Sequence, residues 1–356
     1  APATSKETEN GVQGELWSVH GGGFYHNQKY LTGPKSQPLT QNLHWFKWEA
    51  YTTWLSGMAM LIIVYWVGAG TYLIDKSVLN LTPAAAIAIS LASLVVGWFV
   101  YDGLCKVLER RPLLLGISIF AFLVLASWVL FHLFGARAAY IHVGAIIGTI
   151  MVANVAHVII PGQKKMLAQI RAGLDPDPRP GQLAKIRSVH NTYLTLPVLF
   201  IMISGHYPMT YDSRYGWLVL AFIGIAGVLV RYFFILTHQK RLVPALPIAA
   251  VLILLGVAVA IAPHRASSSL PVSFETVRPI FAQRCAVCHA ARPTQPGFAQ
   301  APAGVLLDTP NHIRVNAQRI EQQAVLTHAM PLGNVTGMSP QERAQVGAWI
   351  AGGEVK

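Results

Sequence analysis

Residues 141–160 read IHVGAIIGTIMVANVAHVII, and this run of 20 residues holds no Asp, Glu, Lys or Arg. A helix of about 20 apolar residues crosses the roughly 30 Å hydrocarbon core of a bilayer, because each residue adds about 1.5 Å. The run is therefore long and apolar enough to be a transmembrane helix. The alternative is a buried helix of a soluble core, and such helices are usually shorter.

The same pattern recurs along most of the chain. Of the 356 residues, 53% are hydrophobic and only 12% are charged, and the mean hydropathy is +0.44. We therefore expect an all-α fold in which residues 1–263 form a polytopic bundle of transmembrane helices. Seven apolar runs predict its spans, at about 50–74, 83–104, 112–134, 138–160, 190–211, 216–237 and 243–263.

The basic residues predict the orientation of these spans. A formal net charge of +12 is also found in nucleic-acid-binding proteins, but here the charge follows the spans, so we expect no nucleic-acid partner. By the positive-inside rule, loops rich in Lys and Arg are cytoplasmic. One side has only Lys76, Arg137 and Arg214. The other side has fourteen basic residues: Lys29, Lys35, Lys47, Lys106, Arg110, Arg111, Lys164, Lys165, Arg171, Arg179, Lys185, Arg187, Lys240 and Arg241.

A different kind of sequence follows the last span. Residues 284–293 read RCAVCHAARP, which places Cys285 and Cys288 directly before His289. In C-x-x-C-H the two thiols reach the vinyl groups of one haem, and the histidine binds its iron. A disulfide or half of a zinc site is the alternative, but no second cysteine pair follows. The motif predicts one covalent haem c.

A sixth ligand to the iron is expected further along. Met330 lies 41 residues after His289, in the stretch THAMPLGN, and a methionine thioether raises the potential of a histidine-ligated haem. Met338, His312 and His328 are competing ligands. We expect a class I cytochrome c in residues 273–356, joined to the membrane part by a linker at 264–272. Within it, Ser339, Pro340 and Glu342 predict a capping box at the start of a helix. Haem c is attached outside the bacterial inner membrane, and the seven spans also place the C-terminus there, in the periplasm.

Two histidines of the fourth span predict a second kind of haem. His142 and His157 are 15 residues apart, which on an ideal helix means about 22 Å along the axis and roughly 60° around it. They would share a face at two depths, as ligands of two haem b groups do. The alternative is that both lie at interfaces and bond to neighbouring groups.

Candidate catalytic residues lie before the first span. Residues 19–25 read VHGGGFY, so His20 precedes three glycines that permit close approach of a ligand to the backbone. Residues 43–51 read LHWFKWEAY, which sets Lys47 and Glu49 among aromatic rings. This mixture suits a flat anion, through stacking and charge, although an interfacial aromatic belt with a snorkelling lysine has the same composition. We predict that His20, Lys47 and Glu49 bind substrate and transfer protons.

Several long blocks of the sequence resemble a known family. They are GELWSVHGGGFY, LHWFKWEAYTTWLSG, YLID, HVGAIIGTIMVANV, IIPGQKKM and HNTYLTLPVLFIMISGHYP, in this order from residue 14 onward. They are similar to the bacterial membrane-bound urate oxidases, also called urate hydroxylases, whose members carry a C-terminal cytochrome c. The resemblance implies oxidation of urate to 5-hydroxyisourate without direct use of oxygen. Electrons would pass through the fused cytochrome to a terminal oxidase or a soluble cytochrome.

The resemblance leaves two questions open. Family members begin with a further hydrophobic helix, so we expect an eighth span that is absent from this sequence. A non-catalytic membrane cytochrome, carrying electrons from quinol to a periplasmic acceptor, is the alternative function. A substrate bound near the inner surface would also lie roughly 30 Å from an outer haem, so the alternatives are intermediate haems or a site beneath the cytochrome. Nothing in the sequence specifies an oligomeric state.

Overall fold

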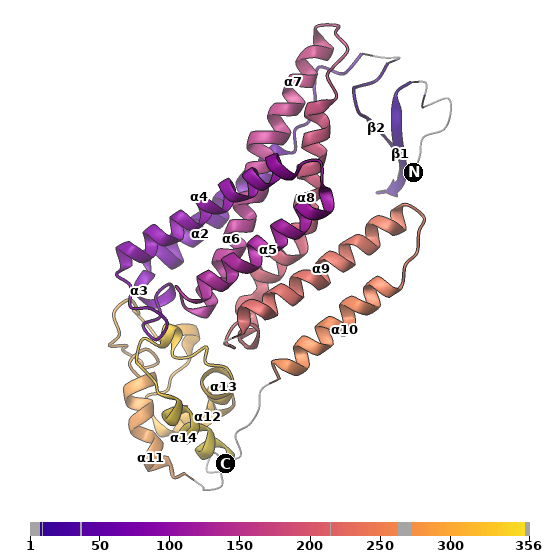
Figure 1. Ribbon diagram of the computed structural model, residues 1–356. Coiled ribbons are helices and arrows are strands. Elements are labelled where there is room, and N and C mark those ends of the chain that lie inside the picture. The colour runs from indigo at the N-terminus through magenta and orange to yellow at the C-terminus, as the bar shows by residue number, and fades with distance from the viewer. Residues whose placement is uncertain (1–7, 9, 36–37, 214, 263–271, 353–356) are drawn as a thin grey trace.

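The computed structural model in Figure 1 describes residues 8, 10–35, 38–213, 215–262 and 272–352. The predicted linker at 264–272 lies almost wholly outside the described residues. Most of the described chain is helical, as predicted. Six helices are long and apolar enough to cross a membrane, and they run over Lys47–Val67, Pro83–Leu108, Pro112–Phe131, Ala136–Arg171, Arg179–His206 and Gly216–His238.

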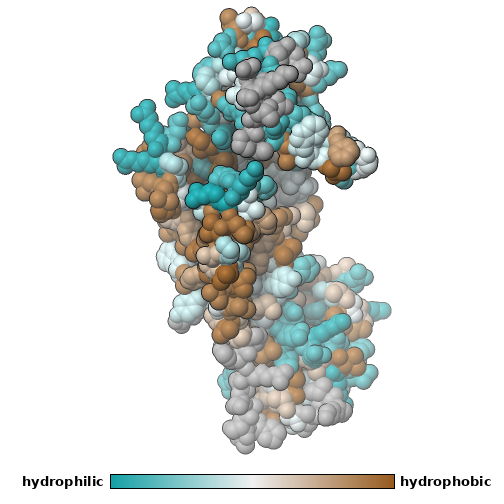
Figure 2. Space-filling view, turned by 90° about the vertical axis from the view of Figure 1, so that its right-hand side faces the viewer, coloured by the Kyte–Doolittle hydropathy of each residue, from teal (hydrophilic) through white to brown (hydrophobic). Residues whose placement is uncertain are grey.

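Six of the seven predicted spans therefore correspond to such helices. In chain order, the first span is α2 continued by η1, the second is α4 and the third is α5. The fourth is α6 continued by η2 and α7, the fifth is α8 continued by η3, and the sixth is α9. The seventh run forms the shorter helix α10 (Ala245–Ala260), which packs against α9. With 16 residues, α10 rises about 24 Å, less than the hydrocarbon core of a typical bilayer. Figure 2 shows hydrophobic side chains along the middle of the bundle and hydrophilic ones at both ends.

The fourth and fifth spans extend beyond their predicted ends. Helix α6 (Ala136–Ala153) continues through the π-helical turn η2 (Asn154–Ile159) into α7 (Ile160–Arg171). Helix α8 (Arg179–Ile203) begins 11 residues before the predicted start of its span at residue 190. The extra turns carry most of the basic residues of this loop and lie together at the upper end in Figure 1. Hydropathy marks where a helix leaves the apolar region, but it does not show that the helix continues in water.

The prediction of an all-α fold is wrong at the N-terminal end. Strands β1 (Val12–His20) and β2 (Gly23–Tyr30) form an antiparallel hairpin in which His20 pairs with Gly23. The two residues of the turn, Gly21 and Gly22, both have positive φ, of 55° and 80°. A two-residue hairpin turn requires this conformation, and glycine adopts it without a steric cost. The glycine run in VHGGGFY therefore has a structural role.

Helix α6 forms the centre of the membrane bundle, where Tyr140, His142 and Ile150 are fully buried. Its neighbours approach closely at two glycines. A Cβ on Gly144 would lie 2.6 Å from Ile201 Cγ2, and a Cβ on Gly97 would lie 2.7 Å from Ile146 Cγ2. The absence of a side chain at these positions permits the close packing of α6 with α8 and α4.

Residues 272–352 form a second group of helices with its own core, here called the C-terminal bundle. Its elements include α11 (Phe274–Ile280), η5 (Phe281–Cys285), α12 (Pro310–Val315), α13 (Ala317–Ile320), η7 (Glu321–Leu326) and α14 (Pro340–Ala351). Trp349 and Val277 are completely buried in this core. The predicted capping box is present, because Ser339 and Glu342 exchange side-chain to backbone hydrogen bonds at the start of α14.

The C-terminal bundle and the β-hairpin lie at opposite ends of the membrane helices (Figure 1). We call these ends the α3 end, after the short helix α3 (Ala69–Tyr72), and the hairpin end. The short turn η8 (Leu332–Asn334) of the C-terminal bundle packs against α3. Beside it, Asp212 of the α8–α9 connection accepts a hydrogen bond from the His328 backbone N–H, and the His328 ring lies 3.7 Å away.

Candidate functional site

The C-x-x-C-H motif lies at the end of the first helix of the C-terminal bundle. Cys285 ends η5, and its carbonyl accepts hydrogen bonds from the backbone N–H groups of Cys288 (3.1 Å) and His289 (2.9 Å). This turn holds both thiols and the imidazole on one short segment. Burial raises the pKa of the Cys285 thiol to about 12, so the free thiol stays protonated at neutral pH.

The imidazole of His289 is oriented for ligation. Its Nδ1 atom lies 2.9 Å from the Val305 carbonyl oxygen. A carbonyl only accepts, so Nδ1 must carry the proton and Nε2 keeps a free lone pair. A backbone acceptor on the second ring nitrogen is the usual way in which a metal-bound histidine is held in place.

The backbone of Met330 is held by hydrogen bonds at its N–H and at its carbonyl. Its backbone N–H donates to the Gln323 carbonyl (2.8 Å), and its carbonyl accepts from the buried Arg343 guanidinium (2.6 Å). Its side chain packs against the same hydrophobic core as Cys285. Cys285 and Met330 therefore meet at one core, and the types of donor present, two thiols, an imidazole and a thioether, are those that a covalent haem requires.

The competing ligands have other contacts. His312 Nδ1 lies 2.7 Å from Asp308, while His328 faces Asp212 on the membrane part. Met338 is only 3% exposed and is a member of the core itself. This arrangement favours Met330.

A polar cluster is buried among the membrane helices towards the hairpin end. We call it the buried polar cluster, and it comprises Tyr101, Asp102, Asn154, Arg187, His190 and Asn191 from α4, η2 and α8. Ionisable residues at membrane depth are costly and usually have a function. Asp102 and His190 are conspicuous in the sequence, whereas the other four are recognised only through their contacts in the structure.

Charge within the cluster is balanced around Asp102. The Arg187 guanidinium donates to Asp102 at 2.6 Å, and Lys106 lies 2.7 Å from the other carboxylate oxygen. Arg187 also donates to Asn154 Oδ1 at 3.3 Å and lies over the Tyr101 ring at 5.1 Å. These contacts fix the guanidinium in a site where its side chain is only 8% exposed.

The hydrogen-bond directions define the protonation of His190. Asn154 Nδ2 donates both to Tyr101 Oη and to Asn191 Oδ1, each at 2.9 Å. Because Tyr101 accepts there, its own proton is directed to His190 Nδ1, 2.9 Å away. A neutral His190 then carries its proton on Nε2. Within the described chain, no hydrogen bond from this Nε2 is present, so it offers a donor to a ligand.

His142 has a defined hydrogen-bonding role. Its Nδ1 lies 2.7 Å from the Ala138 carbonyl, so Nδ1 carries the proton. Its Nε2 lies 2.7 Å from Ser90 Oγ, and that hydroxyl accepts from Trp66 Nε1 at 2.9 Å. Ser90 is therefore the donor to Nε2. A haem on His142 would have to replace this hydroxyl.

His142 and His157 differ in exposure. His142 is fully buried, whereas His157 is exposed and has Trp98 at a ring distance of 5.8 Å. Both contact side chains of α4, Ser90 in the case of His142 and Trp98 in the case of His157, and the π-helical turn η2 makes the rotation between them different from that of an ideal α-helix. Haem b at these residues stays a prediction.

The three predicted catalytic residues do not meet at one point. His20 ends β1 and is exposed. Lys47 begins α2, with its ammonium 5.4 Å from the centre of the Trp48 ring, and Glu49 lies 3.6 Å from His44. A cavity lies nearby, but it is lined by His44 and by none of the three. Their predicted roles stay predictions.

These observations define a class of protein: a largely helical chain with six membrane-spanning candidates and a buried polar cluster. The family model described as "Urate oxidase N-terminal" matches residues 2–262, which is most of the chain. The chain therefore belongs to this urate oxidase-related family. Comparisons with curated proteins and with solved structures gave no match.

Proposed function

We propose that this protein is a membrane-bound oxidoreductase that oxidises urate and passes the electrons to a haem in its own C-terminal bundle. The family match carries the substrate class. The acceptor rests on one observation in the C-terminal bundle. There, the His289 Nδ1 contact with Val305 leaves Nε2 available beside two thiols. This combination supports a urate-related enzyme linked to a cytochrome.

The reaction is balanced without molecular oxygen. Urate and one water molecule give 5-hydroxyisourate, two protons and two electrons. A bound haem supplies a one-electron acceptor, so each turnover needs either two successive reductions or a second redox group. A haem b on His142 or His157 is our proposal for that group.

The residues of the chain have distinct parts in this proposal. Cys285 and Cys288 would attach a haem covalently, and His289 and Met330 would supply ligands to its iron. Arg343 holds the Met330 loop through its carbonyl. At the hairpin end, the Tyr101 hydroxyl bonds to His190 Nδ1 and holds that ring in one orientation.

The proposed location is the bacterial inner membrane, with the C-terminal bundle in the periplasm. The arrangement of the fold supports this orientation, because most of the basic loop residues lie at the hairpin end and the C-terminal bundle lies at the α3 end. A terminal oxidase or a soluble cytochrome would then receive the electrons.

The test is anaerobic addition of urate to the purified, haem-loaded protein. We expect the visible spectrum to change to that of reduced haem c, with 5-hydroxyisourate formed at one molecule per two electrons. A haem that stays oxidised with urate, yet is reduced by dithionite, would contradict the proposal. Reduction by a quinol but not by urate would instead identify an electron carrier.

A further inference from the structure

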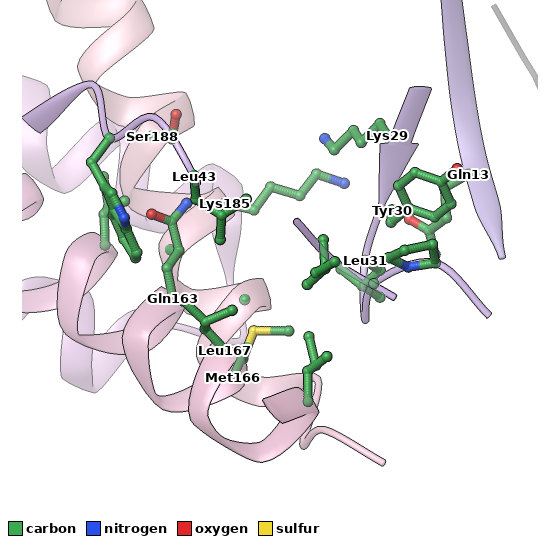
Figure 3. Close-up of a pocket in the computed structure, with 18 of the residues that line it drawn as sticks. Gln13, Lys29, Tyr30, Leu31, Leu43, Gln163, Met166, Leu167, Lys185 and Ser188 are labelled. Carbon is green, nitrogen blue, oxygen red and sulfur yellow. The ribbon is translucent and has the colours of Figure 1, made fainter. Parts of the chain in front are cut away.

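A cavity of about 700 Å³ lies at the hairpin end, between the N-terminal segment and helices α7 and α8. Figure 3 shows its lining residues, which come from the hairpin, the chain before α2 and the two helices. The volume is in the range of small-molecule sites, which span about 300–1,000 Å³. The buried polar cluster and the haem residues take no part in its lining.

The cavity is positively charged. Lys29 of β2 and Lys185 of α8 approach it from opposite sides, and their ammonium groups point into the same open space (Figure 3). His44 adds a third group that is able to carry a positive charge. Among the described residues, no Asp or Glu lines the cavity and no ion pair of either lysine is present. Two unpaired ammonium groups facing one space favour an anion.

The remaining lining distinguishes between kinds of anion. Trp45, Leu43 and Leu167 provide apolar walls that suit a flat ring. Gln163 and Ser188 offer hydrogen-bond donors and acceptors together. A phosphate headgroup has acceptors only, whereas an oxidised purine has carbonyl and N–H groups alternating around its edge. The mixture of donors and acceptors therefore fits the purine better.

Helix α8 connects this cavity to the buried polar cluster. Lys185, Ser188 and Thr192 line the cavity, while Arg187 and His190 belong to the cluster. Cavity and cluster residues thus alternate along two turns of one helix. A molecule in the cavity is therefore in contact with the same helix that carries Arg187 and His190 of the cluster.

We infer that this cavity is the binding site for the urate monoanion, with Lys29 and Lys185 neutralising its charge and Gln163 forming hydrogen bonds with the polar groups at the edge of its ring. The inference rests on the proposed function and assigns the location of its substrate. It also places the substrate at the end of the bundle that the positive-inside rule assigns to the cytoplasm, where the basic loops attract anions.

The test measures urate binding apart from turnover. Full-length, haem-loaded protein is reduced in advance, freed of reductant, and titrated with urate by calorimetry in nanodiscs of phosphatidylcholine. We expect Lys29→Gln and Lys185→Gln each to raise the Kd about tenfold or more. Lys165→Gln is the matched control, because Lys165 is exposed on α7 at the same end and does not line the cavity. It should bind as the unaltered protein does.

The outcomes are distinguishable. Unchanged urate affinity in both variants, with normal haem spectra, would overturn this site while leaving the proposed function intact. An unaltered protein that neither binds urate nor is reduced by it would overturn both. The same titration in nanodiscs that contain phosphatidylglycerol tests whether an anionic lipid headgroup occupies the cavity instead of urate. If the anionic lipid abolishes urate binding and Gln163→Leu leaves urate affinity unchanged, the cavity holds a lipid headgroup and the inference fails.

Discussion

Replacing Gly333 by alanine should loosen the contact between the C-terminal bundle and the membrane helices. Gly333 lies in η8 with φ of 56°, and a Cβ built there would be 2.9 Å from the Thr71 carbonyl and 3.2 Å from that of Ile74. The substitution has two costs. Left-handed backbone costs alanine about 1–2 kcal/mol, and overpacking against a rigid backbone costs about 1–3 kcal/mol more.

Only the second cost acts on the contact between the two parts. It should lower the equilibrium constant for the docked arrangement by roughly five- to 150-fold. Gly304→Ala is the matched control, because Gly304 has φ of 67° in the same bundle but no atom within 4 Å of a built Cβ. Both variants bear the backbone cost, and only Gly333→Ala also forces the two parts to separate.

Amide hydrogen exchange measures this difference directly. We expect faster exchange at residues 71–75 and 207–213 in Gly333→Ala but not in Gly304→Ala. Under the proposed function, urate should also reduce the haem more slowly in Gly333→Ala, while a small soluble reductant acts equally on both variants. Equal exchange in the two variants would refute the reasoning, since it would mean that Thr71 and Gly333 do not hold the parts together.

Three further predictions concern single side chains. Under the proposed function, Met330→Ala should remove an iron ligand and lower the haem reduction potential, whereas Met338→Ala should mainly destabilise the core, by about 2–5 kcal/mol. Potentiometry and thermal melting measure the two effects, and a lowered potential in Met338→Ala but not in Met330→Ala would contradict the assignment. Arg187→Gln should cost about 1.5–3 kcal/mol in thermal unfolding because Asp102 loses its charged hydrogen bond and keeps only Lys106, and Arg187→Lys should recover part of that loss. Burial raises the pKa of Glu342, but the Ser339 N–H and Arg284 outweigh it and hold that pKa below its usual value. The stabilisation is therefore complete above the ordinary glutamate pKa of about 4.3 and is lost as the pH falls through the lowered value, so Glu342→Gln should flatten the acid side of the melting profile.

The sequence predicted the features that depend on composition over a long window or on a fixed spacing. Six apolar runs became long helices, and the Ser339 capping box formed as expected. Features that depend on local twist were missed. The glycines of VHGGGFY were interpreted as permitting close approach of a ligand, but Gly21 and Gly22 form a hairpin turn, and the π-helical turn η2 was not predicted.

The candidate sites were predictable to different degrees. The residues of C-x-x-C-H are adjacent in the sequence and lie on one short turn, so the sequence alone indicates the motif. The buried polar cluster is assembled from three helices. Tyr101, Asn154 and Arg187 are far apart in the sequence, so their hydrogen bonds to one another are seen only in the folded structure. The cavity at the hairpin end is similar, because Lys29 and Lys185, which are far apart in the sequence, line one cavity only in the folded chain.

The two proposed sites lie at opposite ends of the bundle, so electrons must cross it. Aromatic rings cover part of the distance: Trp98 lies 5.8 Å from His157 and 6.0 Å from Tyr101, and at the other end His142 lies 5.8 Å from Tyr65. Ser90, which bonds to His142, and Trp98 are eight residues apart on α4, or about 12 Å along its axis.

A redox group that bridges this stretch has few places to lie. Helices α4 and α6 meet there at Gly97, where a Cβ would be 2.7 Å from Ile146, so no macrocycle fits between them. His142 is enclosed and its Nε2 is bonded to Ser90, whereas His157 lies within η2 and is exposed. Under the proposed function, a membrane haem is therefore expected at His157, alongside the α4–α6 contact instead of within it.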